Sequence, residues 1–441
     1  MRMKLLVLAL AAISPTTAAW AAIDRAAGAS VDASLARTMP DLLALYRDLH
    51  QHPEIAFQET RTAALLAKRM RGLGFAVTEH VGRTGLVAVL KNGAGPTVMV
   101  RVEMDALPME EKTGLPYASK AQATVDGKPV PVDHACGHDT HMAWWIGTAE
   151  ALLATKDRWN GTLVFVAQPA EEIISGAKAM LADGLFTRFP KPDYGFAAHV
   201  GPEPTGMIVV KQGVYSSASD TVLLTFHGVG AHGSMPDKSI DPVVQGARFV
   251  EDVQTVVARE KDPKAFGVVT VGAFNAGSVA NIIPDHADLQ LTIRSFDPAV
   301  RTLLNEGVDR TARAVAAMTR APAPDIRRPY GTAPVINNDA LAAQAAGLLK
   351  QEFRPENVVL SPASAPGGSA SEDYSAFVDA GLTKSVYFGI GGTPPATMAR
   401  YKAEGKPVPG NHSPYFAPDP DASIRAGVKV LTLAVMMVAR H

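Results

Sequence analysis

Residues 134–141 read His134-Ala135-Cys136-Gly137-His138-Asp139-Thr140-His141 and contain the only cysteine of the 441-residue chain. A lone thiol cannot form an internal disulfide, so burial, reactivity or metal binding remains as its role. Thiolate and imidazole groups at such close spacing bind borderline-soft divalent metals well. The stretch therefore predicts a metal site, and the sequence on either side predicts the fold that carries it.

Short apolar runs alternate with helical patterns on both sides of this stretch. Residues 85–90 and 97–102 predict two adjacent strands, and residues 162–167 predict a buried strand. Helical periodicity predicts three helices in the same region, over 41–50 (capped by Asp41 after Pro40), 59–73 and 142–154. Such alternation is typical of an α/β fold with a mostly parallel central sheet that helices flank on both faces.

The pattern changes near Gly213 and returns to its first form after residue 330. The intervening order is strand, helix, strand, strand, helix, strand, over 221–227, 241–259, 267–274, 287–296, 298–319 and a segment near Ile326. This is the order of a split βαβ, ferredoxin-like α+β module. Two helices and a strand follow it, over 338–353, 422–439 and 385–389. We therefore predict one domain formed by residues 22–213 and 331–441, interrupted by an inserted domain of residues 214–330.

The first residues have the features of a secretory signal peptide. Arg2 and Lys4 give a positive start, residues 5–13 are apolar, and Ala19-Trp20-Ala21 is an A-x-A cleavage pattern. The apolar run is too short for a permanent membrane anchor. A buried N-terminal helix is the alternative interpretation. We expect residues 1–21 to be removed near Ala21, and the protein to be periplasmic or secreted with no membrane contact afterwards.

The composition excludes some classes of partner. Hydrophobic residues are 47% and charged residues 19% of the chain, and the formal net charge is −1. There is no long basic run, which argues against a nucleic-acid surface. A free thiol in an oxidising compartment is a liability unless it is buried or ligated, so predicted export strengthens the metal interpretation of Cys136.

Further polar residues follow the apolar runs or lie in a polar loop. Asp105, Glu171 and Glu172 come directly after predicted strands, where α/β sheets place their functional residues. His199 follows small apolar residues, and His412 lies in a loop near the C-terminus. Each alone has an ordinary explanation, as a turn cap, a solvated acidic pair, a core histidine or a loop histidine. Two adjacent carboxylates at a strand end repel each other, and a bound metal reduces this repulsion. One carboxylate can then bind the metal while the other acts as a general base.

Together these residues supply a ligand set of one thiolate, three imidazoles and one carboxylate, namely Cys136, His138, Glu172, His199 and His412. Five protein ligands are too many for one tetrahedral zinc with an open position, but they suit two ions that share a bridging water. A structural zinc is normally closed by four cysteine or histidine ligands on local hairpins. Here the ligands come from distant segments, which favours an active site.

Five segments of the chain form a series of motifs, namely 101–108 (RVEMDALP), 134–139 (HACGHD), 168–172 (QPAEE), 411–414 (NHSP) and 49–54 (LHQHPE) with Glu59 and Thr60. They resemble the motifs of the dinuclear metallo-amidohydrolases that include hippurate hydrolases, aminoacylases and indole-acetyl-amino-acid hydrolases. The resemblance covers essentially the whole mature chain, in the same order. It implies a zinc-peptidase-like catalytic domain with an inserted lid or dimerisation domain, which matches the predicted insert.

The resemblance also implies roles for the matching residues. The five ligands would bind two divalent ions, zinc first, with manganese, cobalt or nickel as alternatives. Glu171 would be the general base and acid, and Asp105 would support the metal site and the base. Glu103 stands where relatives often carry aspartate. We expect this longer acid to adjust the packing around the site without joining the ligands.

Three residues of the insert resemble positions that bind substrate. His232 lies in 228–233 (GVGAHG), a segment whose histidine reaches the reacting carbonyl, often from across a dimer. Asn281 and Arg294 match segments that bind the polar end of the substrate. The alternatives are a glycine-rich turn for His232, a turn cap for Asn281 and a solvated strand position for Arg294. A homodimer through the insert follows from the resemblance alone.

We therefore expect an exported, metal-dependent amidohydrolase that cleaves the amide bond of N-acyl amino acids or similar small conjugates. A carboxypeptidase or dipeptidase of the same family, acting on short peptides, is the alternative within that class. A cysteine hydrolase that uses Cys136 as nucleophile would instead survive a chelator. A non-catalytic exported metal- or solute-binding protein is the alternative from another class, and a carboxylate placed as a base argues against it.

Overall fold

The computed structural model of the protein describes residues 15–440, with side chains from residue 26 onward. Most of the predicted signal peptide, residues 1–14, lies outside the described residues. Residues 15–21 begin the long helix α1 (Pro15–Gln51). No helix within the described part of the chain is both long enough and apolar enough to cross a membrane.

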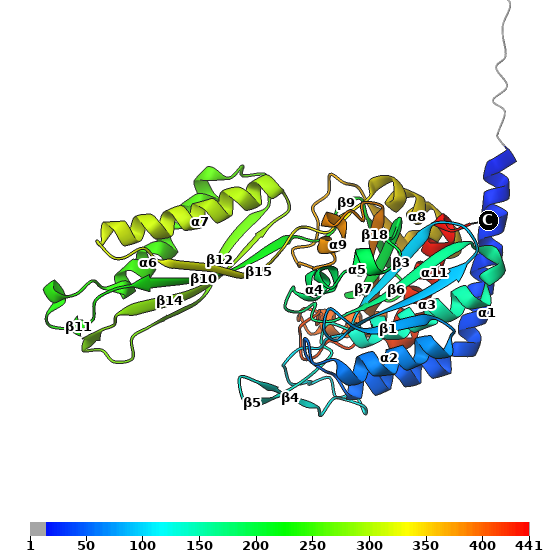
Figure 1. The fold of residues 1–441 in the computed structure, drawn as a ribbon, viewed down its shortest axis with the longest axis horizontal. Coiled ribbons are helices and arrows are strands. Elements are labelled where there is room, and N and C mark those ends of the chain that lie inside the picture. The colour runs from blue at the N-terminus through cyan, green and yellow to red at the C-terminus, as the bar shows by residue number, and fades with distance from the viewer. Residues whose placement is uncertain (1–14, 441) are drawn as a thin grey trace, which may run out of the picture.

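An eight-stranded sheet forms the centre of the larger domain (Figure 1). Its order is β1-β2-β6-β3-β7-β18-β8-β17. These strands are β1 (Ala76–Val81), β2 (Gly85–Asn92), β3 (Thr97–Glu103), β6 (Gly161–Gln168), β7 (Tyr194–Pro204), β8 (Ile208–Lys211), β17 (Val358–Ser361) and β18 (Ser385–Thr393). The run β6-β3-β7-β18 and the pair β17-β8 are parallel, and the other pairings are antiparallel, so the sheet is mixed with a parallel centre.

The predicted α/β class is confirmed, but the predicted adjacency of the strands at 85–90 and 97–102 is wrong. β6 lies between β2 and β3. The helix α3 (His138–Ala154) lies in the connection from β3 to β6. Two parallel neighbours need such a crossover, so the strand that follows α3 takes the place beside β3.

Helices cover both faces of this sheet. Alternation along β3 directs Val98 and Val100 to one hydrophobic core and Met99 to the other. The first core also contains α1, α2 (Thr60–Gly72), α3, α8 (Asp339–Glu352) and α11 (Pro420–Val438). The second contains the short helices α4 (Gly176–Ala182), α5 (Leu185–Arg188) and α9 (Ser375–Asp379).

The prediction that a helix begins at Asp41 is wrong, because α1 runs through Pro40. A proline inside a helix removes one backbone hydrogen bond and would normally end it. Leu35, Met39 and Leu42 of α1 are nevertheless buried in the first core, where α1 packs on α3 and α11. Tertiary packing therefore outweighs the local signal.

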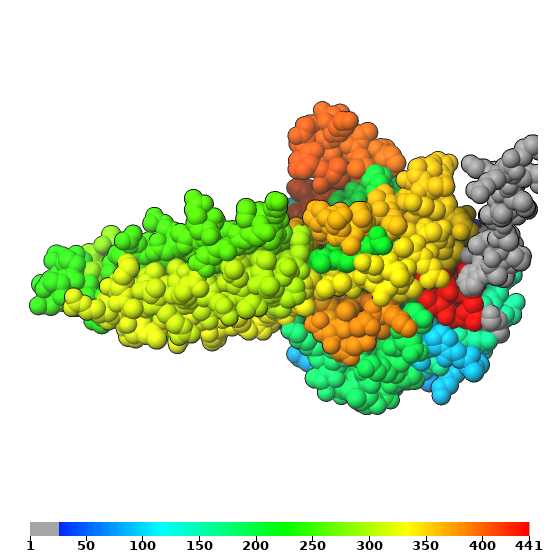
Figure 2. Space-filling view, turned by 90° about the horizontal axis from the view of Figure 1, so that it is seen from above, coloured from blue at the N-terminus to red at the C-terminus, as the bar shows by residue number. Residues whose placement is uncertain are grey.

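The segment between β9 and β16 forms a separate body that projects from the larger domain (Figures 1 and 2). Its elements are β10 (Ala218–His227), α6 (Pro242–Asp252), β12 (Gly267–Ala276), β14 (His286–Ser295), α7 (Pro298–Met318) and β15 (Asp325–Thr332). They form an antiparallel sheet of order β12-β14-β10-β15 with a core of its own. This order is the split βαβ order expected for an inserted module, while the domain boundaries at 213/214 and 330/331 stay a prediction.

Small elements complete the described chain. The two-stranded ribbons are β4 (Gln122–Val125) with β5 (Lys128–Pro131), β9 (Gly213–Val214) with β16 (Ile336–Asn337), and β11 (Ala231–His232) with β13 (Ile282–Ile283). The helix α10 (Pro395–Ala403), three short 3₁₀ helices at Lys156–Arg158, Pro236–Lys238 and Pro355–Asn357, and a short π-helix at Val256–Glu260 make up the rest. The helix predicted over 241–259 is present as α6, which is interrupted at Val253 and followed by helical residues up to Glu260.

Candidate metal and active site

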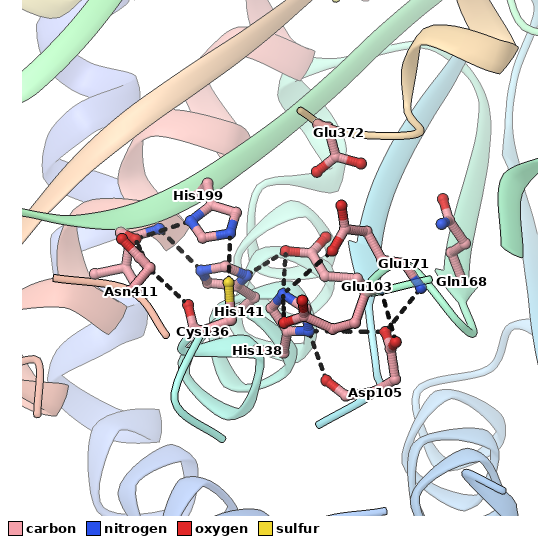
Figure 3. A network of polar contacts seen from close by, with 12 residues as sticks. Glu103, Asp105, Cys136, His138, His141, Gln168, Glu171, His199, Glu372 and Asn411 are labelled. Atoms are coloured by element: carbon pink, nitrogen blue, oxygen red, sulfur yellow. Dashed lines mark hydrogen bonds and ion pairs between the residues drawn. The ribbon is translucent and has the colours of Figure 1, made fainter. Parts of the chain in front are cut away.

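The five predicted ligands converge at one edge of the central sheet, and Figure 3 shows three of them, Cys136, His138 and His199. The Sγ atom of Cys136 lies 3.4 Å from Nε2 of His199, and Nε2 of His412 lies 3.2 Å from Oε2 of Glu172. Nε2 of His138 lies 3.9 Å from Oε1 of Glu172. β3, β6 and β7 are parallel, so the residues at their carboxyl ends meet at the same edge.

Gly137 sets the spacing between the thiol and the first imidazole. Its φ of +89° is a left-handed conformation that favours glycine. A Cβ atom at this position would lie 2.4 Å from Cγ1 of Val200 on β7. The glycine therefore lets the turn before α3 approach the strand that carries His199, with Cys136 on one side and His138 on the other.

Backbone carbonyls fix the orientation of two of the imidazoles. Nδ1 of His138 donates to the carbonyl of Asp105 at 2.6 Å, and Nδ1 of His199 donates to the carbonyl of Val200 at 2.8 Å. Each ring is thereby left with an unprotonated Nε2 directed into the cluster. Among the described side chains, Nε2 of His138 and Oε1 of Glu172 are buried atoms without a hydrogen-bond partner.

The donor set fits two divalent cations. Cys136, Glu172 and His412 form one group with ligand atoms within 4.8 Å of one another, and His138, Glu171 and Glu172 form a second. His199 lies with His138 in a third group, which also contains Glu103 and His141. Glu172 belongs to the first two groups. Burial raises the pKa of the Cys136 thiol, and the nearby carboxylates Glu172 and Glu171 raise it further. Divalent ions would supply the missing positive charge and would use the unpartnered atoms.

Asp105 holds the backbone that presents the acidic pair. Its Oδ1 accepts the N–H of Glu171 at 3.0 Å, and its Oδ2 accepts the N–H of Glu172 at 2.9 Å. Burial raises the pKa of Glu171 well above its ordinary value, and repulsion from Glu372 and Glu172 adds to this effect. Asp105 thus orients both carboxylates through the backbone, as the resemblance implies, and its role in function stays a prediction.

His141, beside the cluster, has contacts that the sequence pattern did not reveal, including one with Glu103. Nε2 of His141 accepts the N–H of Val200 at 2.9 Å, so its Nδ1 carries the hydrogen and donates to Glu103. Both ring nitrogens of His141 are therefore occupied, and the ring is unsuited to metal binding although it lies beside His138. Its place one turn after His138 on α3 is the signal that could have identified it.

A buried charge network lies behind Glu103. Arg101 is fully buried and donates to Glu103, to Glu372 at 2.7 Å and to Gln168 at 3.0 Å. Burial alone would raise the pKa of Glu372, but Arg101 lowers it below its ordinary value. Glu103 therefore packs between Arg101 and His141, and its expected exclusion from the ligands stays a prediction, since it also lies in a possible metal group with His138.

Asn411 secures the loop that carries His412. Its Nδ2 donates to the carbonyls of Cys136 and Val200, each at 3.0 Å. The N–H of His412 donates to the carbonyl of Ala135 at 2.8 Å. A residue from the C-terminal part of the chain is thus tied to two segments that come much earlier in the sequence.

The three predicted substrate-binding residues lie in different places. Arg294 lines a cavity of about 800 Å³ together with Cys136, Glu171 and His412, and its Nη1 donates to Oγ of Ser371 at 2.6 Å. His232 lies in the β11–β13 ribbon, at the end of the insert away from the cluster (Figure 1), and Asn281 immediately precedes β13. Within one chain the structure brings Arg294 to the site but not His232 or Asn281. Contact of these two with substrate, predicted to come from across a dimer, stays a prediction.

Removal of the thiol should lower the metal content. Cys136 belongs to the group that includes Glu172 and His412. Cys136→Ala leaves this group without its softest ligand, so we expect about one ion per chain instead of two. Metal analysis after gel filtration checks this result. Ser413→Ala, a change beside His412 that removes no predicted ligand, serves as the control. Unchanged metal content in Cys136→Ala would rule out the thiol as a ligand.

Comparisons with known proteins identify the family of the chain. The model of peptidase family M20/M25/M40 matches residues 99–437. The chain is 36% identical to the hippurate hydrolase of Campylobacter jejuni over 341 residues, which cover 75% of this chain and 83% of that protein. It is 33% identical to the N-acetylcysteine deacetylase of Bacillus subtilis over 355 residues, or 80% of this chain and 89% of that protein.

A solved structure shows the same overall fold. A dinuclear metal binding peptidase of the M20 family from Bacillus subtilis superposes with a TM-score of 0.70 at 26% identity, covering 91% of this chain and 98% of that chain. The family match spans most of the chain and includes four of the motifs on which the resemblance rests, as well as every predicted ligand. The chain therefore belongs to peptidase family M20/M25/M40 and is a metal-dependent hydrolase of that family.

Proposed function

We propose that this protein hydrolyses the amide bond of N-acyl amino acids or similar small conjugates. The observation that carries the proposal is a buried carboxylate, Glu171, that stands beside the ligand Glu172 and shares a cavity with Arg294. A base, a ligand cluster and a cation for a carboxylate are the parts that such a reaction needs. The names of the hippurate hydrolase and the N-acetylcysteine deacetylase support the substrate class.

The roles of the residues follow from their positions. Cys136, His138, Glu172, His199 and His412 would hold two divalent ions, with zinc favoured by the thiolate and imidazole donors and with manganese, cobalt and nickel as alternatives. When bound, the ions supply Lewis-acid activation of water and charge stabilisation at the carbonyl oxygen. Glu171 takes a proton from the attacking water and returns it to the nitrogen of the leaving amine. Arg294 holds the free carboxylate of the substrate.

Loss of the Arg294 guanidinium should weaken substrate binding selectively. Arg294 is held by Ser371 at the wall of the cavity. For Arg294→Ala we expect KM for an N-acyl amino acid to rise about 10- to 100-fold, the loss expected for a charged hydrogen bond. KM for the same N-acyl amino acid with its carboxylate converted to a carboxamide should change little, because this substrate has no carboxylate for Arg294 to bind. Steady-state kinetics on this matched pair checks the prediction, and equal effects on both substrates would contradict it.

A substrate screen with metal analysis tests the proposed function. Metal-loaded protein is assayed on aromatic and aliphatic N-acyl amino acids and, in parallel, on dipeptides and C-terminally extended peptides. Preferred hydrolysis of the N-acyl amino acids supports the proposal. Preferred hydrolysis of peptides would favour the carboxypeptidase or dipeptidase alternative. Metal binding without turnover of any of these amides would favour a non-catalytic binding protein.

Export and dimerisation belong to the same proposal. The charged start, the apolar run and the A-x-A pattern of residues 1–21 support a cleaved signal and a periplasmic or secreted protein. N-terminal sequencing of protein from the cell envelope should begin just after Ala21, and an intact Met1 would contradict this. Sedimentation of the purified protein tests a homodimer through the insert, which would be required for His232 to reach another chain's site.

A further inference from the structure

The cavity beside the ligand cluster contains a carboxylate without a partner. Glu203, near the C-terminal end of β7, lines this cavity together with His199, Glu171 and Arg294. Among the side chains that the structure describes, none donates a hydrogen bond to this carboxylate, and no basic group lies within 4.0 Å of it. Glu203 is half-buried and lines the wall of the cavity.

The other charged groups that line the cavity have a hydrogen-bond partner or a place in the proposed metal groups. The carboxylate of Glu372 accepts hydrogen bonds from Arg101 and from the hydroxyl of Tyr387. Glu171 and Glu172 belong to the proposed metal groups, whereas Glu203 does not. The ammonium of Lys211 donates to two backbone carbonyls, at 2.6 and 2.8 Å. Among the carboxylates that the structure describes along this cavity, Glu203 is thus the one with neither a hydrogen-bond partner nor a place in the proposed metal groups.

The Glu203 carboxylate lies over Gly201, on the strand that carries His199. Strand alternation places His199 and Gly201 on the same side of β7, and the pairing with β18 shifts register beyond Gly201. A Cβ atom at Gly201 would lie 2.2 Å from Oε2 of Glu203. The carboxylate therefore folds back over Gly201, in space that any larger residue would fill. The rise of a strand places Gly201 about 7 Å from His199.

We infer that Glu203 selects substrates that carry a cationic group, an ammonium or guanidinium, on a chain long enough to reach from the scissile amide to this carboxylate. The inference rests on the proposed function and narrows its substrate class. Arg294 holds the carboxylate of such a substrate, and Glu203 pairs with its positive charge in a partly desolvated cavity, where the attraction is stronger than in water. A bound substrate whose cation is absent or too short would leave the Glu203 carboxylate partly desolvated and unpaired. Such a substrate should therefore bind more weakly than one with a well-placed cation. The cation is carried by the side chain of the amino acid or by the acyl group.

Two pairs of substrates distinguish a cation on the amino-acid side chain from a cation on the acyl group. The first pair is Nα-benzoyl-lysine and Nα-benzoyl-2-aminoheptanoate, in which a methyl group replaces the ammonium. The second is 6-aminohexanoyl-leucine and heptanoyl-leucine. Racemic amino acids are used, since no chirality is assumed, and kcat and KM are measured with metal-loaded wild type, Glu203→Gln and Glu356→Gln. Glu356 is an exposed glutamate outside the cavity and provides the matched control.

The wild type should prefer the cationic member of one pair by about tenfold or more in kcat/KM, mainly through KM. In Glu203→Gln this preference should fall below about threefold with metal content unchanged, whereas Glu356→Gln should keep it. Equal rates within both pairs, or a preference that survives in Glu203→Gln, would overturn the inference while leaving the proposed function intact. Failure of the wild type to hydrolyse any of the four substrates would overturn both the inference about Glu203 and the proposed function.

Discussion

Replacement of Glu171 by glutamine should lower kcat by about 10²- to 10⁴-fold while both metal ions remain bound. Glutamine keeps the size of the side chain but cannot accept the proton of the attacking water. Glu171 is buried, lies 4.0 Å from Nε2 of His138 and is held by the backbone hydrogen bond to Asp105. The substitution removes the proposed base without removing a predicted ligand, so turnover should fall much more than substrate binding.

Kinetics and metal analysis on the same preparation check this expectation. Glu356→Gln, the exposed glutamate control, should keep wild-type turnover and metal content. Activity of Glu171→Gln within about tenfold of the wild type would refute the proposed base, since this is less than general-base catalysis normally contributes. Loss of an ion from Glu171→Gln would show instead that this carboxylate serves as a ligand.

Replacement of Arg101 by methionine should destabilise the larger domain by about 3–5 kcal/mol. The guanidinium is the shared partner of three buried carboxylates, Glu103, Glu372 and Asp373. Methionine fills much of the volume but leaves these acids without their counter-charge. The free energy of unfolding should therefore fall by the large amount that is typical of a broken buried ion pair.

Urea unfolding followed by tryptophan fluorescence measures this effect in the domain concerned. Trp144, Trp145 and Trp159 are fully buried in its core. Arg425→Met, which breaks an exposed pair with Asp421, is the matched control and should cost less than about 1 kcal/mol. An effect of Arg101→Met as small as that of the control would show that the network contributes little to stability.

The ligand cluster could be predicted from sequence because its residues follow a local rule. Glu171 and Glu172 follow β6, and His199 lies on β7, both in the parallel centre of the sheet. Neighbouring parallel strands bring the residues near their carboxyl ends to one edge of the sheet, and this does not depend on the details of the other elements. Cys136 and His138 are separated by one glycine, so their proximity is fixed by the chain itself.

Other features depend on contacts between distant segments and had no local signal. Glu372 and Asp373 meet Arg101 across about 270 positions of sequence, from a loop without periodic pattern. Pro40 is a strong local signal for a helix start, but the packing of α1 overrides it. The remote placement of His232 depends on how far the insert projects, which motif similarity does not specify (Figure 1).

Anomalous X-ray diffraction from crystals grown with zinc tests most directly whether these side chains form a dinuclear centre. We predict two strong peaks per chain in the space bounded by Cys136, His138, Glu172, His199 and His412, one of them within about 2.3 Å of the cysteine sulfur. Glu172 should contact both ions, because it belongs to two of the ligand groups. The absence of an anomalous peak within bonding distance of that sulfur or of the three imidazoles, in crystals of zinc-loaded protein that is catalytically active, would contradict the proposed dinuclear centre.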